Sequence, residues 1–216
     1  MTPPRILVVG AGPGIGAAVA QRFAAEGFLP ALVVRSETEI PGLAAGLPTS
    51  SAFLAADLAD PATLPRVLAW AEPFEPEAFL YNASAGRPAL PSALEAEHLE
   101  TSLQVNLRAP LALTQALLPG FRRRGRGTLL FTGGGLALTP KAPECALSIG
   151  KAALRSFALA LADELAPEGL HAATLTVAGF LQRDTPFSPE AVAEAADITR
   201  ANGISPATLR RHLAVL

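Results

Sequence analysis

Cysteine is nearly absent from this chain, with one residue in 216. A single cysteine excludes an internal disulfide and any zinc site built from several cysteines. The three histidines, His98, His171 and His212, do not have the spacing of metal ligands, so we expect no metal site. Methionine, tryptophan and tyrosine also occur once each, which makes Tyr81 the only phenol in the chain.

Charge is sparse as well. Charged residues make up 17% of the chain and the formal net charge is −2, which argues against a protein that neutralises nucleic-acid phosphates. The one basic run, Arg122–Arg124 with Arg126, follows a predicted helix. We interpret it as a solvated turn at the negative end of that helix, with contact to an anion or a partner as the alternative.

Long apolar stretches are missing too. Because no stretch of about 18 apolar residues lacks a charge or a proline, we expect no membrane span. The N-terminal sequence MTPPRILVVG has no apolar segment of the kind found in secretory signals, so the reducing cytoplasm is the expected location. Hydrophobic residues still make up 50% of the chain, which is enough for a sizeable core.

Short apolar runs alternate with longer helical stretches along the chain. Strands are predicted at Ile6–Val9, Ala31–Val34, Phe53–Ala56, Phe79–Tyr81, Thr128–Phe131 and Ala173–Val177. Helices are predicted at Ile15–Glu26, within Pro61–Ala71, at Ser92–Leu118 with an interruption at Pro110, at Cys145–Leu165 and from Pro189 to about Ala201, with a weaker apolar end at Leu209–Leu216. This alternation predicts an α/β fold of the Rossmann type: one domain over residues 1–216, with a doubly wound parallel sheet between two helical layers.

A glycine-rich loop lies directly after the first predicted strand and directly before the first predicted helix. Its candidate cofactor-binding residues are Gly10, Gly12, Gly14, Ile15 and Gly16. Glycines let the backbone approach a pyrophosphate closely, and the start of the helix offers free N–H groups and a positive dipole end. The loop therefore predicts a dinucleotide-binding site. The alternative is a glycine-rich turn without a ligand.

The second predicted strand ends in Arg35 and lacks the carboxylate expected there for an NAD ribose. Arg35 can pair with a 2′-phosphate, so we predict that NADP(H) is preferred and that NAD(H) is possible. The alternative is that Arg35 is an ordinary solvated residue.

Several further positions, in the same order, resemble the short-chain dehydrogenase/reductase family. They are the spacing Gly10-x3-Gly14-x-Gly16, Asp57-Leu58, Asn82-Ala83-Ser84, Asn106 within Val105–Leu107, Lys151 within Gly150–Ala153, and Val177–Phe180, with Ser84 and Ala178 replacing the family's glycine and proline. The likeness covers about residues 5 to 185. It implies hydride transfer between carbonyls and alcohols with NAD(P)(H), and a homodimer or homotetramer formed through the two long helices.

The same resemblance implies individual roles for these positions. Asp57 and Leu58 would contact the adenine, Asn82 and Ala83 would border the cofactor, and Gly179 would lie beside the nicotinamide. Asn106 and Lys151 would be catalytic, with Lys151 also holding the nicotinamide ribose. A segment around residues 180–205 would cover the substrate.

Two departures from the family concern the proton donor. The family's catalytic tyrosine lies four residues before its lysine, where this chain has Leu147, and the catalytic serine falls near Gly134. Since general acid catalysis is typically worth about 10²–10⁴-fold, the usual reduction should be severely weakened. The C-terminus also lacks the family's final glycine-rich strand segment.

Other groups could supply the proton. Pro110 has no N–H, so the Asn106 carbonyl four residues earlier loses its helical partner. The resemblance implies that a water at this carbonyl would relay a proton to Lys151; the alternative is a kink needed only for packing. A water held by Lys151 is the simplest substitute donor. The side chains we considered and regard as structural are Thr132, Ser148, Glu144 and Cys145.

Two functions remain open from the sequence. One is an oxidoreductase with a depleted active site, acting on an unknown small carbonyl or alcohol. The other is a dinucleotide-binding sensor or structural partner without catalysis.

Overall fold

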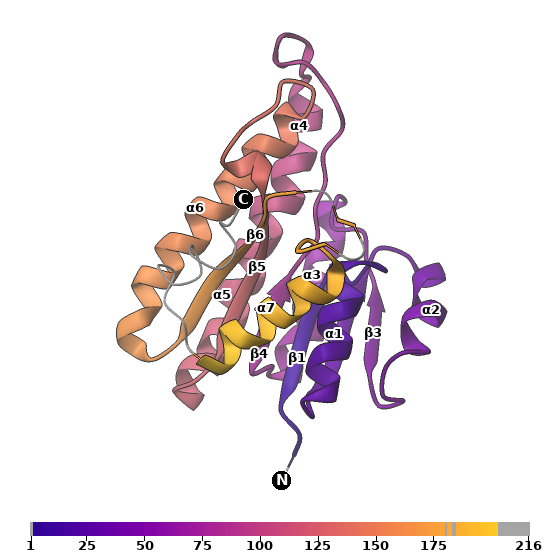
Figure 1. Ribbon diagram of the computed structural model, residues 1–216, viewed down its shortest axis with the longest axis vertical. Helices are drawn as coiled ribbons and strands as arrows, with labels where there is room; N and C mark the ends of the chain where they lie inside the picture. Colours follow the sequence, from indigo (N-terminus) through magenta and orange to yellow (C-terminus); the bar gives the residue numbers. More distant parts are fainter. Residues whose placement is uncertain (1, 180, 183–184, 203–216) are drawn as a thin grey trace.

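The computed structural model describes residues 2–179, 181–182 and 185–202 of the chain (Figure 1). Within these residues six parallel strands form one sheet in the order β3-β2-β1-β4-β5-β6. They are β1 (Arg5–Val9), β2 (Leu29–Val34), β3 (Ala52–Ala55), β4 (Ala78–Tyr81), β5 (Thr128–Gly134) and β6 (His171–Val177). This is the predicted Rossmann-type sheet, whose strand order reverses between β1 and β4.

Helices cover both faces of the sheet. The α-helices are α1 (Ile15–Ala25), α2 (Ile40–Ala44), α3 (Leu64–Ala71), α4 (Ala96–Leu103), α5 (Ala109–Arg124), α6 (Cys145–Leu165) and α7 (Pro189–Asn202). Because successive strand residues point to opposite faces, Leu7 and Val9 pack with α3, α5 and α6, while Ile6 and Val8 pack with α1 and α7. The apolar run of β1 is therefore buried on both faces of the sheet, as is typical of a parallel strand between two helical layers.

The long helical region divides differently from the prediction. The structure begins it at α4 rather than at Ser92, and it places a π-helical turn at Gln104–Arg108 between α4 and α5. The break thus precedes Pro110, which lies in the first turn of α5, where a helix tolerates a missing N–H. Strand β5 also runs three residues past Phe131, because Thr132–Gly134 pair with Leu175–Val177.

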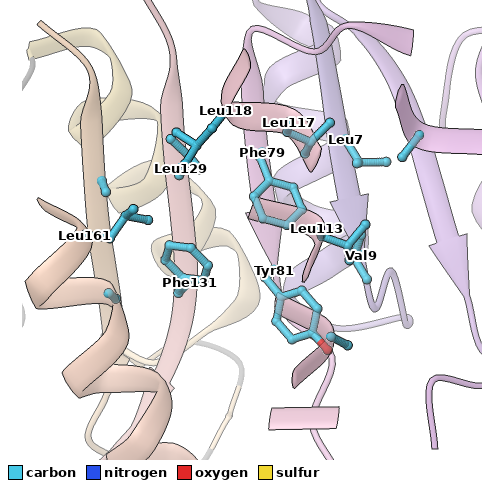
Figure 2. Close-up of a cluster of buried hydrophobic side chains, with 14 of the residues drawn as sticks. Leu7, Val9, Phe79, Tyr81, Leu113, Leu117, Leu118, Leu129, Phe131 and Leu161 are labelled. Atoms are coloured by element: carbon cyan, nitrogen blue, oxygen red, sulfur yellow. The ribbon is translucent and has the colours of Figure 1, made fainter. Parts of the chain in front are cut away.

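Tyr81 is a core residue, and its hydroxyl serves the π-helical turn. The side chain is fully buried beside Phe79 and Leu113 (Figure 2). Its hydroxyl donates a hydrogen bond to the Val105 carbonyl at 2.5 Å. Burial raises the pKa of the Tyr81 phenol well above its ordinary value. The one tyrosine is therefore held as a neutral hydrogen-bond donor inside the fold.

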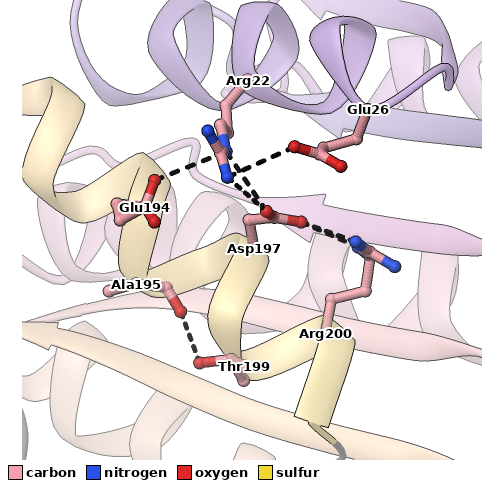
Figure 3. Close-up of polar contacts among 7 residues, drawn as sticks. All are labelled: Arg22, Glu26, Glu194, Ala195, Asp197, Thr199 and Arg200. Carbon is pink, nitrogen blue, oxygen red and sulfur yellow. Dashed lines mark hydrogen bonds and ion pairs between the residues drawn. The ribbon is translucent and has the colours of Figure 1, made fainter.

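A network of charged side chains fastens α7 to α1 (Figure 3). The Asp197 carboxylate is 8% exposed and accepts from the guanidinium of Arg22 at 3.0 Å and from that of Arg200 at 2.7 Å. Arg22 also pairs with Glu26 at 3.3 Å and with Glu194 at 3.5 Å. Since the glycine loop leads directly into α1, the network holds α7 against the helix that begins at the predicted binding site.

The basic run lies in the last turn of α5 and directly after it, and carboxylates pair with it. Arg122 pairs with Glu168 at 2.7 Å, and Arg126 pairs with Glu77 at 3.1 Å. Arg122 and Arg126 are exposed, whereas Arg124 is partly buried over the Phe121 ring, so the interpretation as a solvated turn fits only part of the run.

Helix α6, with the turn that follows it, is long and apolar enough by composition to cross a membrane. Its Leu154, Ala158 and Leu165 side chains are buried in the core against β5 and β6. Packing against the sheet therefore accounts for the apolar face of this helix.

Candidate functional site

A cavity of about 750 Å³ opens at the carboxyl edge of the sheet, where the strand order reverses. This is the place where open α/β sheets bind ligands. The predicted cofactor-binding residues that line it are Gly10, Gly12, Arg35, Asp57, Leu58, Asn82 and Ala83. The lining includes neither Gly14, Ile15 and Gly16 at the start of α1 nor the predicted nicotinamide-side residues Lys151 and Gly179.

The glycine loop has the geometry of a phosphate cradle. Gly10 has a φ of +83°, and a Cβ there would lie 2.3 Å from the Ala83 nitrogen, so only glycine fits. A Cβ on Gly16 would lie 2.6 Å from the Ala11 Cα, so the first turn of α1 packs closely on the start of the loop. Gly12, in contrast, faces open space. The loop is therefore packed tightly at both ends and open in its middle, where a ligand would approach.

The start of α1 can take up negative charge. The residue that precedes it is Gly14, and no side chain caps its N-terminus. The first N–H groups of a helix have no partner within the helix, and the macrodipole is positive at this end. Ile15 and Gly16 thus begin a helix whose end suits a pyrophosphate.

Two predicted residues lie at the end of β3. The Asp57 side chain is exposed to the cavity and accepts the Ala59 N–H at 3.0 Å, while Leu58 is buried beside it. At the end of β4 the Asn82 side chain donates to the Gly10 carbonyl at 2.8 Å. Asn82 therefore fixes the glycine loop to the neighbouring strand, which is a role in shaping the cavity.

A carboxylate that the sequence analysis did not single out, Glu39, lies beside the end of β2. Arg35 is exposed at the cavity, and its backbone N–H donates to Glu39 Oε2 at 3.2 Å. Glu39 comes from the 3₁₀ turn Glu37–Glu39, whose first residue is preceded by the capping residue Ser36. The available signal was the Ser-x-x-Glu spacing of a capping box, in which a glutamate reaches back toward the start of its own turn.

Lys151 lies on α6 and is buried against β5. Its side chain is 7% exposed, and its Nζ donates to the Thr132 carbonyl at 2.9 Å. Burial lowers the pKa of Lys151 from its ordinary value to about 8. A Cβ on Gly134 would lie 4.0 Å from the Lys151 Cγ, so a side chain at position 134 would lie next to this lysine.

Hydrocarbon occupies the expected tyrosine position. Leu147 lies one turn before Lys151 on α6, so the two share a face of the helix. A Cβ on Gly86 would lie 2.7 Å from the Leu147 Cβ, which shows that the loop after β4 packs directly on this leucine. The other candidate donors do not line the cavity: Thr132 and Ser148 are buried, and Glu144 and Cys145 are partly exposed.

Asn106 has no access to the cavity through its side chain. It is fully buried, and its amide donates to the Ala85 carbonyl at 2.6 Å and to the Ser102 carbonyl at 2.8 Å. Ser102, which the sequence analysis did not single out, also donates to the Ala146 carbonyl at 2.9 Å. These contacts join the loop after β4 to α4 and α6. The role of the Asn106 main-chain carbonyl in a relay stays a prediction.

The segment after β6 is described in part. A Cβ on Gly179 would lie 2.5 Å from the Phe187 ring, so this ring rests on the glycine. Leu181 approaches Gly14, with 4.0 Å between the leucine Cδ1 and a Cβ placed on the glycine. Residues 180, 183–184 and 203–205 of the predicted substrate-covering segment lie outside the described residues. The predicted apolar end at Leu209–Leu216 lies outside them entirely.

Metal ligands do not gather in the part of the chain that the structure describes, since no three His, Cys, Asp or Glu residues come together there in a way that could hold an ion. The carboxyl edge of the sheet thus combines a cavity at the glycine loop with a buried lysine that does not line it.

Known proteins share this sequence pattern and fold. The short chain dehydrogenase family matches residues 4–191. The oxidoreductase asL5 of Sarocladium schorii is 26% identical over 196 residues, which covers 90% of this chain and 78% of that protein. The 3-oxoacyl-[acyl-carrier-protein] reductase FabG of Escherichia coli is 26% identical over 180 residues, covering 82% of this chain and 73% of that protein.

Solved structures share the whole architecture. A short-chain dehydrogenase from Streptomyces avermitilis superposes with a TM-score of 0.84 at 22% identity, covering 99% of this chain and 92% of that one. A metagenomic short-chain oxidoreductase in complex with NADP has a TM-score of 0.81 at 20% identity, with coverage of 92% and 90%. A 3-ketoacyl-(acyl-carrier-protein) reductase from Brucella melitensis complexed with NADH has a TM-score of 0.82 at 24% identity, with coverage of 94% and 92%.

The family match extends over most of the chain, and the glycine loop, the sheet order and the buried lysine lie within it. The chain therefore belongs to the short-chain dehydrogenase family, whose members are oxidoreductases with an NAD(P)-binding Rossmann fold.

Proposed function

We propose that this chain binds NADP(H) at the carboxyl edge of its sheet and acts as an oxidoreductase with a depleted proton-donating centre. The observation that carries the proposal is the glycine loop, which is tight at Gly10 and Gly16 and open at Gly12, at the mouth of a cavity of about 750 Å³. The loop, the start of α1 and the residues after β3 would together hold the pyrophosphate and the adenosine.

Arg35 supports the choice of NADP(H). Its guanidinium is exposed at the cavity and has no hydrogen bond or ion pair to the described part of the chain. Arginine binds phosphate through several fixed donors, so it suits a 2′-phosphate on the adenosine ribose. One solved relative is a complex with NADP and another a complex with NADH, so NAD(H) is the alternative.

The chemistry would follow from what Lys151 can do without a neighbouring tyrosine. A bound nicotinamide would supply a hydride to the carbonyl carbon of a small ketone or aldehyde. The developing alkoxide then needs a proton, and neither Leu147 nor Gly134 has one to give. Lys151, with its pKa lowered to about 8, could hold a water at the oxygen or stabilise the charge.

Titrations of nucleotide binding and assays of turnover test the proposal. Protein fluorescence titrated with NADPH and with NADH should give a saturable signal, tighter for NADPH. A panel of carbonyls and alcohols should then show slow turnover that is lost in Lys151→Ala. Saturable binding without turnover above buffer on the whole panel would refute the catalytic part alone.

The second candidate function is a dinucleotide-binding sensor or structural partner. The packing of Gly86 on Leu147 favours it, because hydrocarbon fills the place where the family has its proton donor. Turnover that depends on Lys151 would exclude this candidate.

We also propose that the chain forms a homodimer or homotetramer through α5 and α6 and that it works in the cytoplasm. Support for the assembly comes from the exposed Ile149 side chain on α6 and from the resemblance to a family that associates through these helices. Light scattering coupled to size exclusion should give a mass of two or four chains. A mass of one chain at micromolar concentration would exclude it.

A further inference from the structure

We infer that Glu39 is the residue that limits discrimination between NADP(H) and NAD(H) in this chain. This inference rests on the proposed function, because it concerns the ribose end of the same cavity. The end of β2 itself has no carboxylate for the ribose. The inference assigns this contact to Glu39, which the following 3₁₀ turn brings to the cavity.

The position of Glu39 follows from a short chain of contacts. Ser36 caps the turn, accepting the Thr38 N–H at 3.2 Å on its Oγ and the Glu39 N–H at 3.2 Å on its carbonyl oxygen. This conformation brings the Glu39 side chain back to β2, where its Oε2 accepts the Arg35 N–H at 3.2 Å. Both Arg35 and Glu39 line the cavity.

The charges around this end of the cavity oppose each other. Arg35 is the one cation among the lining residues from the ends of β2 and β3, and it lies with the carboxylates of Glu39 and Asp57. Glu37 adds a further negative charge on the same turn without lining the cavity. A 2′-phosphate placed beside Arg35 would therefore also lie near one or two carboxylates, which reduces the gain from the arginine.

Glu39 also offers what an unphosphorylated ribose needs. An ionised carboxylate accepts hydrogen bonds from hydroxyl groups and has several acceptor positions. One oxygen of Glu39 is used by the Arg35 N–H, and the other has no partner in the described part of the chain. The same side chain thus stabilises NAD(H) through the ribose hydroxyls and repels the extra phosphate of NADP(H).

A pair of matched substitutions tests this assignment. Glu39→Gln keeps the size of the side chain and removes its charge. Glu37→Gln makes the same change in net charge two residues away, on a residue that does not line the cavity. The probes are NADPH and NADH, together with adenosine 2′,5′-bisphosphate and adenosine 5′-monophosphate, which differ only in the 2′-phosphate.

Glu39→Gln should tighten binding of the two 2′-phosphorylated probes by about three- to tenfold and weaken binding of the other two by about two- to fivefold. Glu37→Gln should leave each dissociation constant within about twofold. The gain of Glu39→Gln should shrink at 0.5 M salt, because screening weakens the repulsion that the substitution removes.

The outcomes separate the two proposals. If the wild-type chain binds none of the four probes, the proposed function fails and the inference fails with it. If all four bind and Glu39→Gln leaves the ratio of affinities for the probes with and without a 2′-phosphate unchanged, the inference alone is overturned. It is also overturned if Glu37→Gln changes this ratio as much as Glu39→Gln does. Thermal unfolding of both variants, with Glu39→Ala as a second substitution at the site, shows that the comparison is made on folded protein.

Discussion

The Tyr81 hydroxyl donates its hydrogen bond to the main-chain carbonyl of Val105, the residue next to Asn106 in the π-helical turn. In this turn the Ala109 N–H bonds to Gln104, and Pro110 has no N–H to offer. The tyrosine thus satisfies a buried carbonyl from outside the helix, and the one phenol of this chain has a structural role.

Removing that hydroxyl should destabilise the fold. Tyr81→Phe leaves the Val105 carbonyl buried without its donor, so we expect the free energy of unfolding to fall by about 1–3 kcal/mol. Urea unfolding followed by circular dichroism measures this change. Phenylalanine keeps the ring packing, so an unchanged unfolding midpoint would show that the hydrogen bond adds nothing to stability.

The buried amine of Lys151 should make stability depend on alkaline pH. Burial lowers its pKa to about 8, below its value in the unfolded chain, so the unfolded state binds more protons between the two values. Stability from this group is therefore lowest below pH 8 and rises as pH increases toward the ordinary lysine pKa near 10.5.

Lys151→Met isolates that contribution. The variant should be more stable than wild type at pH 7 by roughly 2–3 kcal/mol, and the gap should close as pH rises through 8 to 10. The measurement is a series of urea titrations across this range. A constant gap between the two proteins would contradict a lowered lysine pKa.

Restoring the two missing hydroxyls should raise reductase activity. A Cβ at position 134 has no described atom nearer than the Lys151 Cγ at 4.0 Å, so Gly134→Ser fits without a clash. Combined with Leu147→Tyr, it should give NADPH-dependent turnover on a panel of carbonyls that exceeds the wild-type rate by tenfold or more. The control, Leu147→Phe with Gly134→Ser, adds the ring without the hydroxyl and should give no such increase.

A substitution at Gly12 should lower the affinity for nucleotide without lowering the stability of the fold. Gly12→Ala places a methyl group in open space, so it should weaken nucleotide binding by about tenfold or more while the unfolding midpoint stays near wild type. Gly42→Ala, also in open space but on α2, is the matched control and should leave binding unchanged. Equal binding by both variants would remove Gly12 from the site.

The network between α1 and α7 should contribute to stability mainly through Asp197. Asp197→Ala leaves the charges of Arg22 and Arg200 without their nearly buried partner, at an expected cost of about 1–3 kcal/mol. Glu194→Gln removes an exposed partner at 3.5 Å and should cost less than about 1 kcal/mol. Chemical unfolding compares the two, and equal costs would contradict the importance of burial.

The sequence predicted the sheet and the loop because each depends on local patterns. An apolar run that ends in glycine, such as Ile6–Val9 before Gly10, is typical of a buried strand in an α/β chain. Gly133 and Gly134 lie beyond the predicted end of the fifth strand at Phe131, yet they extend β5 because pairing to β6 outweighs their weak strand preference. Pro110 predicted an interruption near the π-helical turn, but the donor to its Val105 carbonyl is Tyr81, 24 residues away in sequence, which no local pattern could reveal.

The site was predicted unevenly for the same reason. Gly10 and Asn82, which directly follow the predicted first and fourth strands, line the cavity. Glu39 was missed because its place in the cavity comes from a side chain folding back over its own turn. Ser102 was missed because its partners come from α6 and from the loop after β4, which only the tertiary fold brings together.

The central place of β1 has a consequence for how the chain is made. This strand bonds to β2 on one side and to β4 on the other, so its second edge stays open on the ribosome until Ala78–Tyr81 has emerged. An unpaired strand that is apolar over Ile6–Val9 invites pairing with other nascent chains. Slowing translation between these two segments should therefore lower the yield of native protein more than slowing it after β4 is complete.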